Sequence, residues 1–190
     1  IPVVTHVYGV DGTYRSDVRI ANPFDGDRTA TLIFTRSGED GSGRFAAVKV
    51  AIAPLQTVAF DDVVERTFRT FGSGTLEVQG DVVVMSRTDG QQVPPNLDTT
   101  ALGEPALLVA PMPQLRGRTN FGLSETAGGR GVVKVGDREL AIAPFSHVQI
   151  PVAAELLEIA IVAGDARVSA YLSQIADDAM FIAAERAAPR

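Results

Sequence analysis

The sequence predicts an all-β protein of two tandem homologous β-sandwich-like modules, each with one short helix. Segments that alternate apolar and polar residues recur about every 8–12 residues with turn formers between them, a spacing typical of β-sandwiches. The stretch IAPLQTVAF, Ile52–Phe60, also recurs as IAPFSHVQI, Ile142–Ile150. Length differences between the two copies fall in loops, so we interpret the pattern as an internal repeat.

The likeness continues on both sides of this stretch. Upstream, Arg15–Phe34 parallels Arg118–Val135, and each begins with Arg, a hydroxyl residue and then Asp or Asn. Downstream, Gly80 and Gly164 are each followed by Asp between two apolar runs. We expect both Gly-Asp pairs to form the turns of β-hairpins.

Strands are predicted wherever apolar residues alternate. In VKVAIA, Val48, Val50 and Ile52 share one face. In TLEVQ, Leu76 and Val78 face inward by the same period. VVKVGDRELAIA indicates two strands around a tight Gly-Asp turn, and NPFDGD supplies further turn formers.

One segment in each half departs from the strand pattern. Asp62 is followed three residues later by Glu65, the spacing of a capping box. We therefore predict a helix over Val63–Arg69, with Val64 and the following phenylalanines at helical spacing. Its counterpart is PVAAELL, Pro151–Leu157, because proline is favoured in a first helical turn.

The two modules are predicted to span residues 1–103 and 104–190, with a linker at about 89–105 that is rich in proline and polar residues. Apolar segments open each module and close the chain. Each such strand has three possible partners: its own half, the other half or another chain.

Composition narrows the classes of function. The 190 residues carry a formal net charge of −6 with no cluster of Lys and Arg, which argues against nucleic acid as a partner. No apolar run approaches the roughly 20 residues of a membrane span. Cysteine is absent, which removes disulfides, thiolate zinc sites and cysteine nucleophiles. The chain begins at Ile1 rather than Met, so either a leader was removed or the sequence was trimmed. We expect the protein to be secreted, extracellular or at the cell surface.

No motif for catalysis is found. His6 and His147 are the only histidines, and we expect His147 on the polar face of a strand. A Ser-His-Asp triad needs three converging groups, and neither a Gly-x-Ser-x-Gly elbow nor a His-Glu-x-x-His motif is present. Gly41–Ala46 superficially matches a dinucleotide fingerprint, but it lies in a predicted hairpin loop. We predict no enzyme activity, no cofactor and no metal.

Acidic residues in turns leave calcium as an alternative, since oxygen-rich loops bind Ca²⁺. The candidates are Asp25, Asp27, Glu39 and Asp40. The Asp-Gly pairs are explained first as turn formers, and the residue spacing of an EF-hand is absent. Two adjacent carboxylate pairs occur, at Asp61-Asp62 and Asp177-Asp178; helix capping accounts for the first.

Four residues at the starts of corresponding strands are predicted to form a structural clamp. They are Arg15, Asp17, Arg118 and Asn120. Residues two apart share a strand face, so we expect Arg15 to pair with Asp17. A ligand site shared by these residues is the alternative. Aromatic platforms for sugars are scarce, with candidates only at Tyr8, Tyr14 and Tyr171.

The first half resembles a group of bacterial exported β-sandwich repeat modules. The likeness rests on YRSDVRIANP, VAIAPLQTVAFDDVV and GSGTLEVQGDVVVMSRT. The matching residues are Arg15, Asp17, Asn22, Pro23, Pro54, Gln56, Asp61, Asp62, Ser86, Arg87 and Thr88. The second half lacks the Asn-Pro turn and the Ser-Arg-Thr ending. The resemblance implies export and modular packing, and no activity.

We therefore expect a non-enzymatic structural or assembly protein, a subunit of an extracellular filament or cell-surface layer that associates through strand edges as a homo-oligomer or polymer. The predicted assembly strands are Ile1–Val4, with Ile1, Val3 and Val4, and Met180–Ala184, with Phe181, Ile182 and Ala183. The alternative is a surface adhesion module that binds glycan or protein. An enzyme is the third hypothesis.

Overall fold

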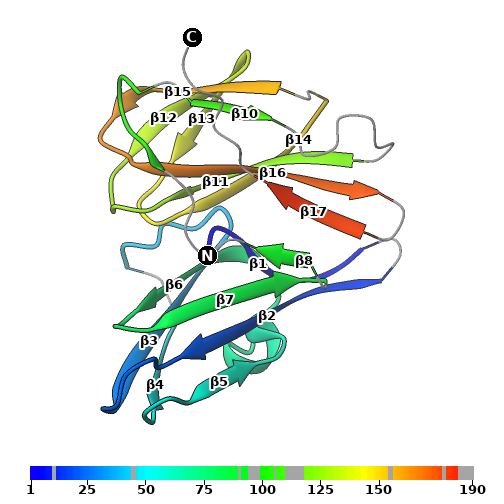
Figure 1. Ribbon diagram of the computed structural model, residues 1–190. Helices are drawn as coiled ribbons and strands as arrows, with labels where there is room; N and C mark the ends of the chain where they lie inside the picture. Colours follow the sequence, from blue (N-terminus) through cyan, green and yellow to red (C-terminus); the bar gives the residue numbers. More distant parts are fainter. Residues whose placement is uncertain are drawn as a thin grey trace.

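The computed structural model describes residues 1–9, 12–43, 46–89, 91–93, 99–104, 106–109, 118–153, 156–176 and 179–183, and it is nearly all β (Figure 1). The N-terminal half consists of β1 (Val4–Tyr8), β2 (Thr13–Ala21), β3 (Arg28–Arg36), β4 (Ala46–Ile52), β5 (Thr57–Phe60), the π-helix η1 (Val63–Thr67), β6 (Gly72–Gln79), β7 (Val83–Thr88) and β8 (Gln91–Val93). The C-terminal half consists of β9 (Thr99–Thr100), β10 (Ala106–Val109), β11 (Arg118–Glu125), β12 (Gly131–Val135), β13 (Arg138–Ile142), β14 (His147–Val152), β15 (Leu156–Gly164), β16 (Val168–Ala176) and β17 (Ala179–Ala183).

Most of the strand pairing of the N-terminal half recurs in the C-terminal half, except that β1 also pairs with β2 and joins the N-terminal strands in one sheet. In the first, β4, β3, β6 and β1 are neighbours, and β2 lies between β5 and β7, with β8 beyond β7. In the second, β13, β12, β15 and β10 are neighbours, and β11 lies between β14 and β16, with β17 beyond β16. All described pairs are antiparallel. The all-β prediction is confirmed, whereas homology between the halves stays a prediction.

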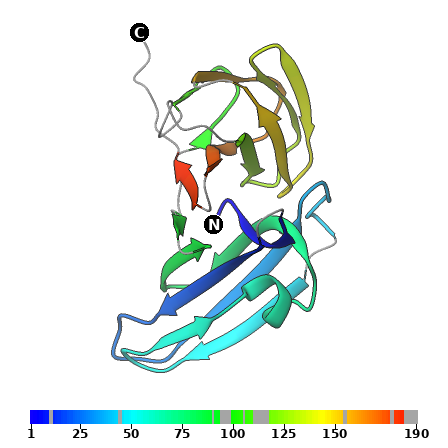
Figure 2. The same cartoon turned by 90° about the vertical axis from the view of Figure 1, so that its right-hand side faces the viewer.

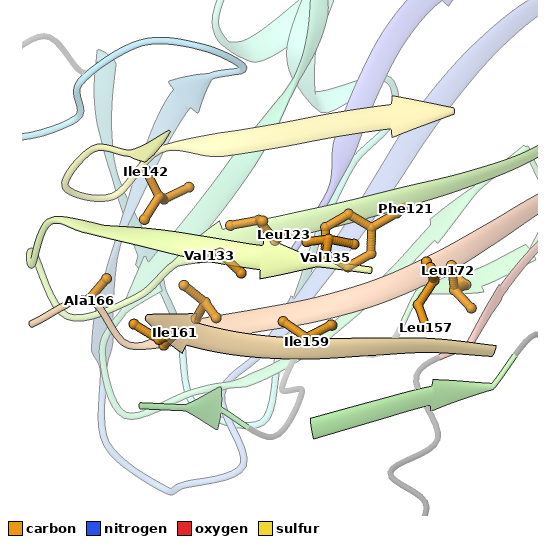
Figure 3. Packing of buried hydrophobic residues seen from close by; sticks show 11 residues of the cluster. Phe121, Leu123, Val133, Val135, Ile142, Leu157, Ile159, Ile161, Ala166 and Leu172 are labelled. Atoms are coloured by element: carbon orange, nitrogen blue, oxygen red, sulfur yellow. The ribbon is translucent and has the colours of Figure 1, made fainter. Parts of the chain in front are cut away.

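Each half buries a hydrophobic core of its own. Val18, Ile20 and Leu32 belong to the core of the N-terminal half. Phe121, Leu123 and the inward side chains of β12 and β15 form the core of the C-terminal half (Figure 3). In β2 and β11 every second residue points inward, as the period of a strand requires. The alternate residues are therefore free to form a second, outer face.

The two Gly-Asp pairs are not hairpin turns, which corrects that prediction. Gly80 ends the path of β6, which pairs with β3 and β1, whereas the following β7 pairs with β2 and β8. Gly164 likewise leads from β15 to β16, which belong to different sheets. It has a φ of 91°, and a Cβ there would lie 2.0 Å from the carbonyl oxygen of Arg130. Glycine is thus required for a close crossing between sheets.

The helix predictions need two corrections. Residues 63–67 form a single π-helical turn, and Asp62 before it has a φ of 52° and makes no side-chain cap. Its carboxylate instead accepts a hydrogen bond from Nδ1 of His6, at 2.8 Å. The helix predicted for Pro151–Leu157 is wrong at its ends, because Pro151 lies in β14 and Leu157 in β15. Residues 154 and 155 lie outside the described part.

The N-terminal segment is paired within its own sheet, and an intermolecular role for Ile1–Val4 stays a prediction. β1 lies between β6 and β2. The nitrogen of Ile1 donates to the carbonyl oxygen of Leu76 at 2.9 Å, and the N–H of Leu76 donates back at 3.1 Å. Val3 and Val4 are buried. These residues are already paired within the chain.

The C-terminal segment has a different place. β17, which contains Phe181 and Ile182, pairs with β16 and ends its sheet, close to β8 of the other half (Figure 1). An intermolecular role for this edge strand stays a prediction. Within the predicted linker, β9 pairs with β16. Among the described residues, no helix has the length and apolar character needed to cross a membrane.

Candidate functional site

The outer face of the β14–β11–β16 sheet is covered by the N-terminal half. Asn120, Gly122 and Ser124 alternate with the core residues of β11, yet they are buried too. The Ser124 hydroxyl donates to the carbonyl oxygen of Pro2 at 2.8 Å and accepts from Oγ1 of Thr75 at 3.0 Å. Figures 1 and 2 both place the N-terminus between the halves. We call this contact region the junction.

The β3–β4 loop forms the second part of the junction. The N–H of Gly38 donates to the carbonyl oxygen of His147 at 2.9 Å, and the N–H of Gly41 donates to that of Pro144 at 2.8 Å. A Cβ on Gly41 would lie 2.7 Å from Cβ of Phe145, so only glycine fits without a shift. The first glycine of GSGRFA, Gly41, therefore serves packing and a backbone hydrogen bond at this contact.

His147, expected on the polar face of its strand, lies in β14 and is fully buried at the junction. Its Nδ1 is hydrogen-bonded to the hydroxyl of Ser37 from the other half, and its Nε2 to the hydroxyl of Tyr171 at 2.7 Å. Burial lowers the pKa of His147 to about 4 and raises the pKa of Tyr171 well above its usual range. At neutral pH the imidazole is thus uncharged, and one ring nitrogen donates while the other accepts.

Glu125 holds the turn onto which the loop docks. Its buried carboxylate accepts from the N–H groups of Ala127 and Gly128, at 2.9 and 2.7 Å, and from those of Phe145 and Arg167, at 3.0 and 3.1 Å. Four backbone donors compensate the burial of the carboxylate.

Asn22 occupies the corresponding place at the end of β2. Its amide donates to the carbonyl oxygens of Ile52 and Ala53, at 3.0 and 3.1 Å. The role of Asn22 and Glu125 was not predicted from the sequence. A polar residue that ends an otherwise alternating strand was the only signal.

A cavity of about 200 Å³ lies within the junction. Its walls are mainly hydroxyl and apolar groups from both halves, namely Val3, Thr5, Val7, Tyr14, Ser73, Thr88, Arg118, Gln149, Tyr171 and Ser173. Ser173 is only 2% exposed, and among the described residues its hydroxyl alone is buried without a hydrogen-bond partner. The cavity therefore has one polar group whose bonding capacity the protein leaves unused.

A second hollow, of about 370 Å³, lies on the N-terminal half and is lined by charged groups, namely Arg15, Asp17, Asp61, Asp62, Arg66, Arg87 and Asp89. Asp17 pairs with Arg87 at 2.9 Å rather than with Arg15, and it accepts from the N–H of Asp62 at 2.9 Å. Partial burial acts to raise the pKa of Asp17, but these two donors outweigh it and the pKa is lowered. Arg19 pairs with Asp61 at 2.6 Å.

The predicted clamp residues are thus divided between two environments. Arg15 and Asp17 line the charged hollow, Arg118 lines the junction cavity and Asn120 is buried at the junction. The predicted pairing of Arg15 with Asp17 is wrong, since Asp17 bonds to Arg87. A clamping role for these residues stays a prediction.

Other candidate residues are dispersed. Asp40 accepts from Ser42 and pairs with Arg130. Within the described ranges, no three His, Cys, Asp or Glu side chains come together as metal ligands. Tyr8 is exposed, whereas Tyr171 is buried. Asp177 and Asp178 lie outside the described residues.

The described fold is that of an all-β protein with antiparallel sheets curled into sandwiches, and its most elaborate polar site is the junction between the halves. In comparisons with known proteins, no family model, no curated protein and no solved structure matches the chain. The resemblance to exported repeat modules remains a prediction.

Proposed function

We propose that the protein is a non-enzymatic structural subunit that self-associates through the outer face of its N-terminal half, within an extracellular filament or cell-surface layer. We call the outer side of β5, β2 and β7, with the turns at its end, the open face. The extracellular location rests on the resemblance to exported modules. The self-association rests on the open face.

The open face carries large apolar side chains in contact with solvent. Val83 and Met85 are two residues apart on β7 and are 51% and 56% exposed. Leu55 is 71% exposed in the turn before β5, and its N–H donates to the carbonyl oxygen of Phe24, which is also exposed. A cluster of exposed apolar groups is characteristic of interaction surfaces.

The same face is covered in the C-terminal half. Pairing places Met85 opposite Arg19 and Tyr171 opposite Gly122, so Met85 and Tyr171 hold equivalent positions. Tyr171 is fully buried under the N-terminal half, whereas Met85 has no covering segment among the described residues. This contrast is the observation that carries the proposal. In the C-terminal half the face is an interface, and in the N-terminal half the equivalent face carries exposed apolar side chains of the kind found at interfaces.

A second copy of the chain suits the open face because the face carries charges of both signs. Asp17 and Asp61 lie near Arg19 and Arg87. A two-fold axis can set acidic groups of one copy against basic groups of the other, as self-complementary interfaces do. Growth beyond a dimer needs another contact, for which β17 remains the predicted strand.

Sedimentation velocity over a range of concentrations tests the proposal. We expect reversible self-association that Met85→Glu weakens strongly, because burying a carboxylate in place of an apolar side chain carries a large desolvation cost. Val162→Glu is the matched control, since Val162 is an exposed apolar residue on the other half and should leave association unchanged. A wild-type chain that stays monomeric, or equal loss in both variants, contradicts the proposal.

A further inference from the structure

We infer that the junction cavity binds one small carboxylated and hydroxyl-rich molecule, of the size and chemistry of a single sugar acid. This site is separate from the open face, and the inference does not depend on self-association. It rests on an unused buried hydroxyl, the bonding capacity of the surrounding hydroxyls, the one charge in the wall and the volume.

The unused hydroxyl is that of Ser173. It lies in β16, two residues after Tyr171, on the face that the N-terminal half covers. A buried polar group without a partner costs about 1–3 kcal/mol. The cost disappears when an occupant of the cavity bonds to this hydroxyl.

The neighbouring hydroxyls also retain bonding capacity. Thr5 and Ser73 share one hydrogen bond of 2.8 Å, which uses the proton of only one of them. Among the described residues, the remaining proton has one weak contact, from Oγ1 of Thr5 to the carbonyl oxygen of Gly72 at 3.5 Å, which is too long for a strong bond. Thr88 shares a bond of 2.6 Å with Ser16. The wall therefore offers several donors and acceptors, the complement of a polyhydroxy ligand.

Charge and shape define the rest of the ligand. Arg118 is the only charged residue of the wall, and no described carboxylate lies within ion-pair distance of it. A guanidinium binds a carboxylate through two parallel hydrogen bonds. Val3, Val7 and the ring of Tyr14 supply apolar wall on which the carbon-bound hydrogens of a sugar ring can pack.

The volume sets the size. About 200 Å³ is well beyond the ~10–15 Å³ that one water requires and below the ~300–1,000 Å³ of pockets for drug-sized ligands. One monosaccharide fits this range, and a chain of several sugars fits only if a single terminal unit enters. Because both halves supply walls, the ligand should also stabilise the junction.

Calorimetric titration with glucuronate and galacturonate tests the inference, with glucose, inorganic phosphate and sulfate as comparison ligands. We expect saturable binding of at least one sugar acid, with the neutral sugar weaker by about tenfold or more through loss of the charge-assisted bonds. Arg118→Gln should weaken sugar acid binding by a similar factor and abolish the preference over glucose. Arg138→Gln, at an exposed arginine on β13, is the matched control and should bind as wild type.

Ser173→Ala provides a second variant that does not threaten folding, because it removes a hydroxyl that the protein itself leaves unbonded. It should weaken sugar acid binding while leaving the unliganded melting temperature unchanged or higher. Absence of binding at millimolar concentration overturns the inference and identifies the cavity as a site for water alone. Equal binding of phosphate and sugar acid would contradict a sugar acid as the ligand. Unchanged affinity in Arg118→Gln would contradict binding in the junction cavity.

Discussion

The two copies of the proline turn have the same backbone and opposite surroundings. Leu55 and Phe145 both follow proline at left-handed φ, 56° and 52°, and each turn is closed by a 3.2 Å hydrogen bond between flanking residues. Pro54–Thr57 is exposed throughout, whereas Pro144, Ser146 and His147 are buried. The turn is therefore a local structure, typical of a proline-directed type II turn, and its burial is decided by what docks on it.

The outer faces of β2 and β11 carry different side chains, as expected if only the face of β11 is covered by the other half. Arg19 on β2 is replaced at the equivalent position of β11 by Gly122, and Thr57 by His147. A Cβ on Gly122 would lie 2.1 Å from the ring of Tyr171. Charges occupy the solvated face, while small or hydrogen-bonded uncharged groups occupy the covered one.

His147→Ala against Thr57→Ala should give the largest difference. The first change opens a cavity and leaves the hydroxyls of Tyr171 and Ser37 without their shared partner, so we expect a loss of about 3–5 kcal/mol in the free energy of unfolding. The exposed Thr57 should change it by less than about 0.5 kcal/mol. Urea unfolding measures both, and similar losses would remove the distinction between the faces.

Acid should weaken the junction through the same histidine. The pKa of His147 is lowered to about 4 in the folded protein from about 6.5 in the unfolded chain, so the unfolded state binds more protons between these values. Stability from this group is complete above about pH 6.5, falls as the pH drops and is lost below about pH 4, by about 3 kcal/mol in total. Urea midpoints across this range should flatten in His147→Gln. An unchanged slope in that variant contradicts a buried neutral imidazole.

Gly122→Ala against Arg19→Ala probes the space on the two faces. The added methyl group must displace the ring of Tyr171, which should cost about 1–3 kcal/mol. Arg19→Ala removes one side chain of a surface ion pair and should cost less than about 1 kcal/mol. Thermal unfolding of the two variants suffices, and a neutral Gly122→Ala would show that the ring of Tyr171 does not lie over Gly122 as described.

Arg87→Ala should have the smallest effect on stability. Its ion pair with Asp17 lies on the solvated face, where such pairs contribute about 0–1 kcal/mol and are screened by salt. We expect a change of less than about 1 kcal/mol in urea unfolding at low salt, and none at high salt. At concentrations where the chain is monomeric, a loss of several kcal/mol would contradict a solvent-exposed ion pair between Arg87 and Asp17.

The sequence predicts the strands well because their signal is local. The tight turn at Gly136 joins β12 to β13 as expected, with Val135 opposite Arg138. The helix predicted to begin at Pro151 is not formed, because Pro151 lies in β14 and pairs with Asn120 of β11. This sheet pairing outweighs the weak preference of the neighbouring residues for a helix.

The junction is harder to predict, because nothing local says which face another part of the chain will cover. A signal exists in hindsight. Outward positions of β2 carry Arg15, Asp17 and Arg19, whereas those of β11 carry Asn120, Gly122 and Ser124 after its first residue. An outward row without charge on one of two similar strands indicates a covered face. The cavity is lined by side chains from both halves, and no spacing of residues in the sequence predicts that they come together.

The most direct test of the contrast between the two turns uses the absence of cysteine in the chain. Gln56→Cys and Ser146→Cys place one thiol at the same position of each turn, where Gln56 is exposed and Ser146 is buried. The rate of modification by a thiol reagent reports access to each. In the monomeric chain, the thiol at position 56 should react as freely as a small exposed thiol. The thiol at position 146 should react only when the junction opens, and therefore more slowly by orders of magnitude. Equal rates at the two positions would contradict a covered face in one half and an open face in the other.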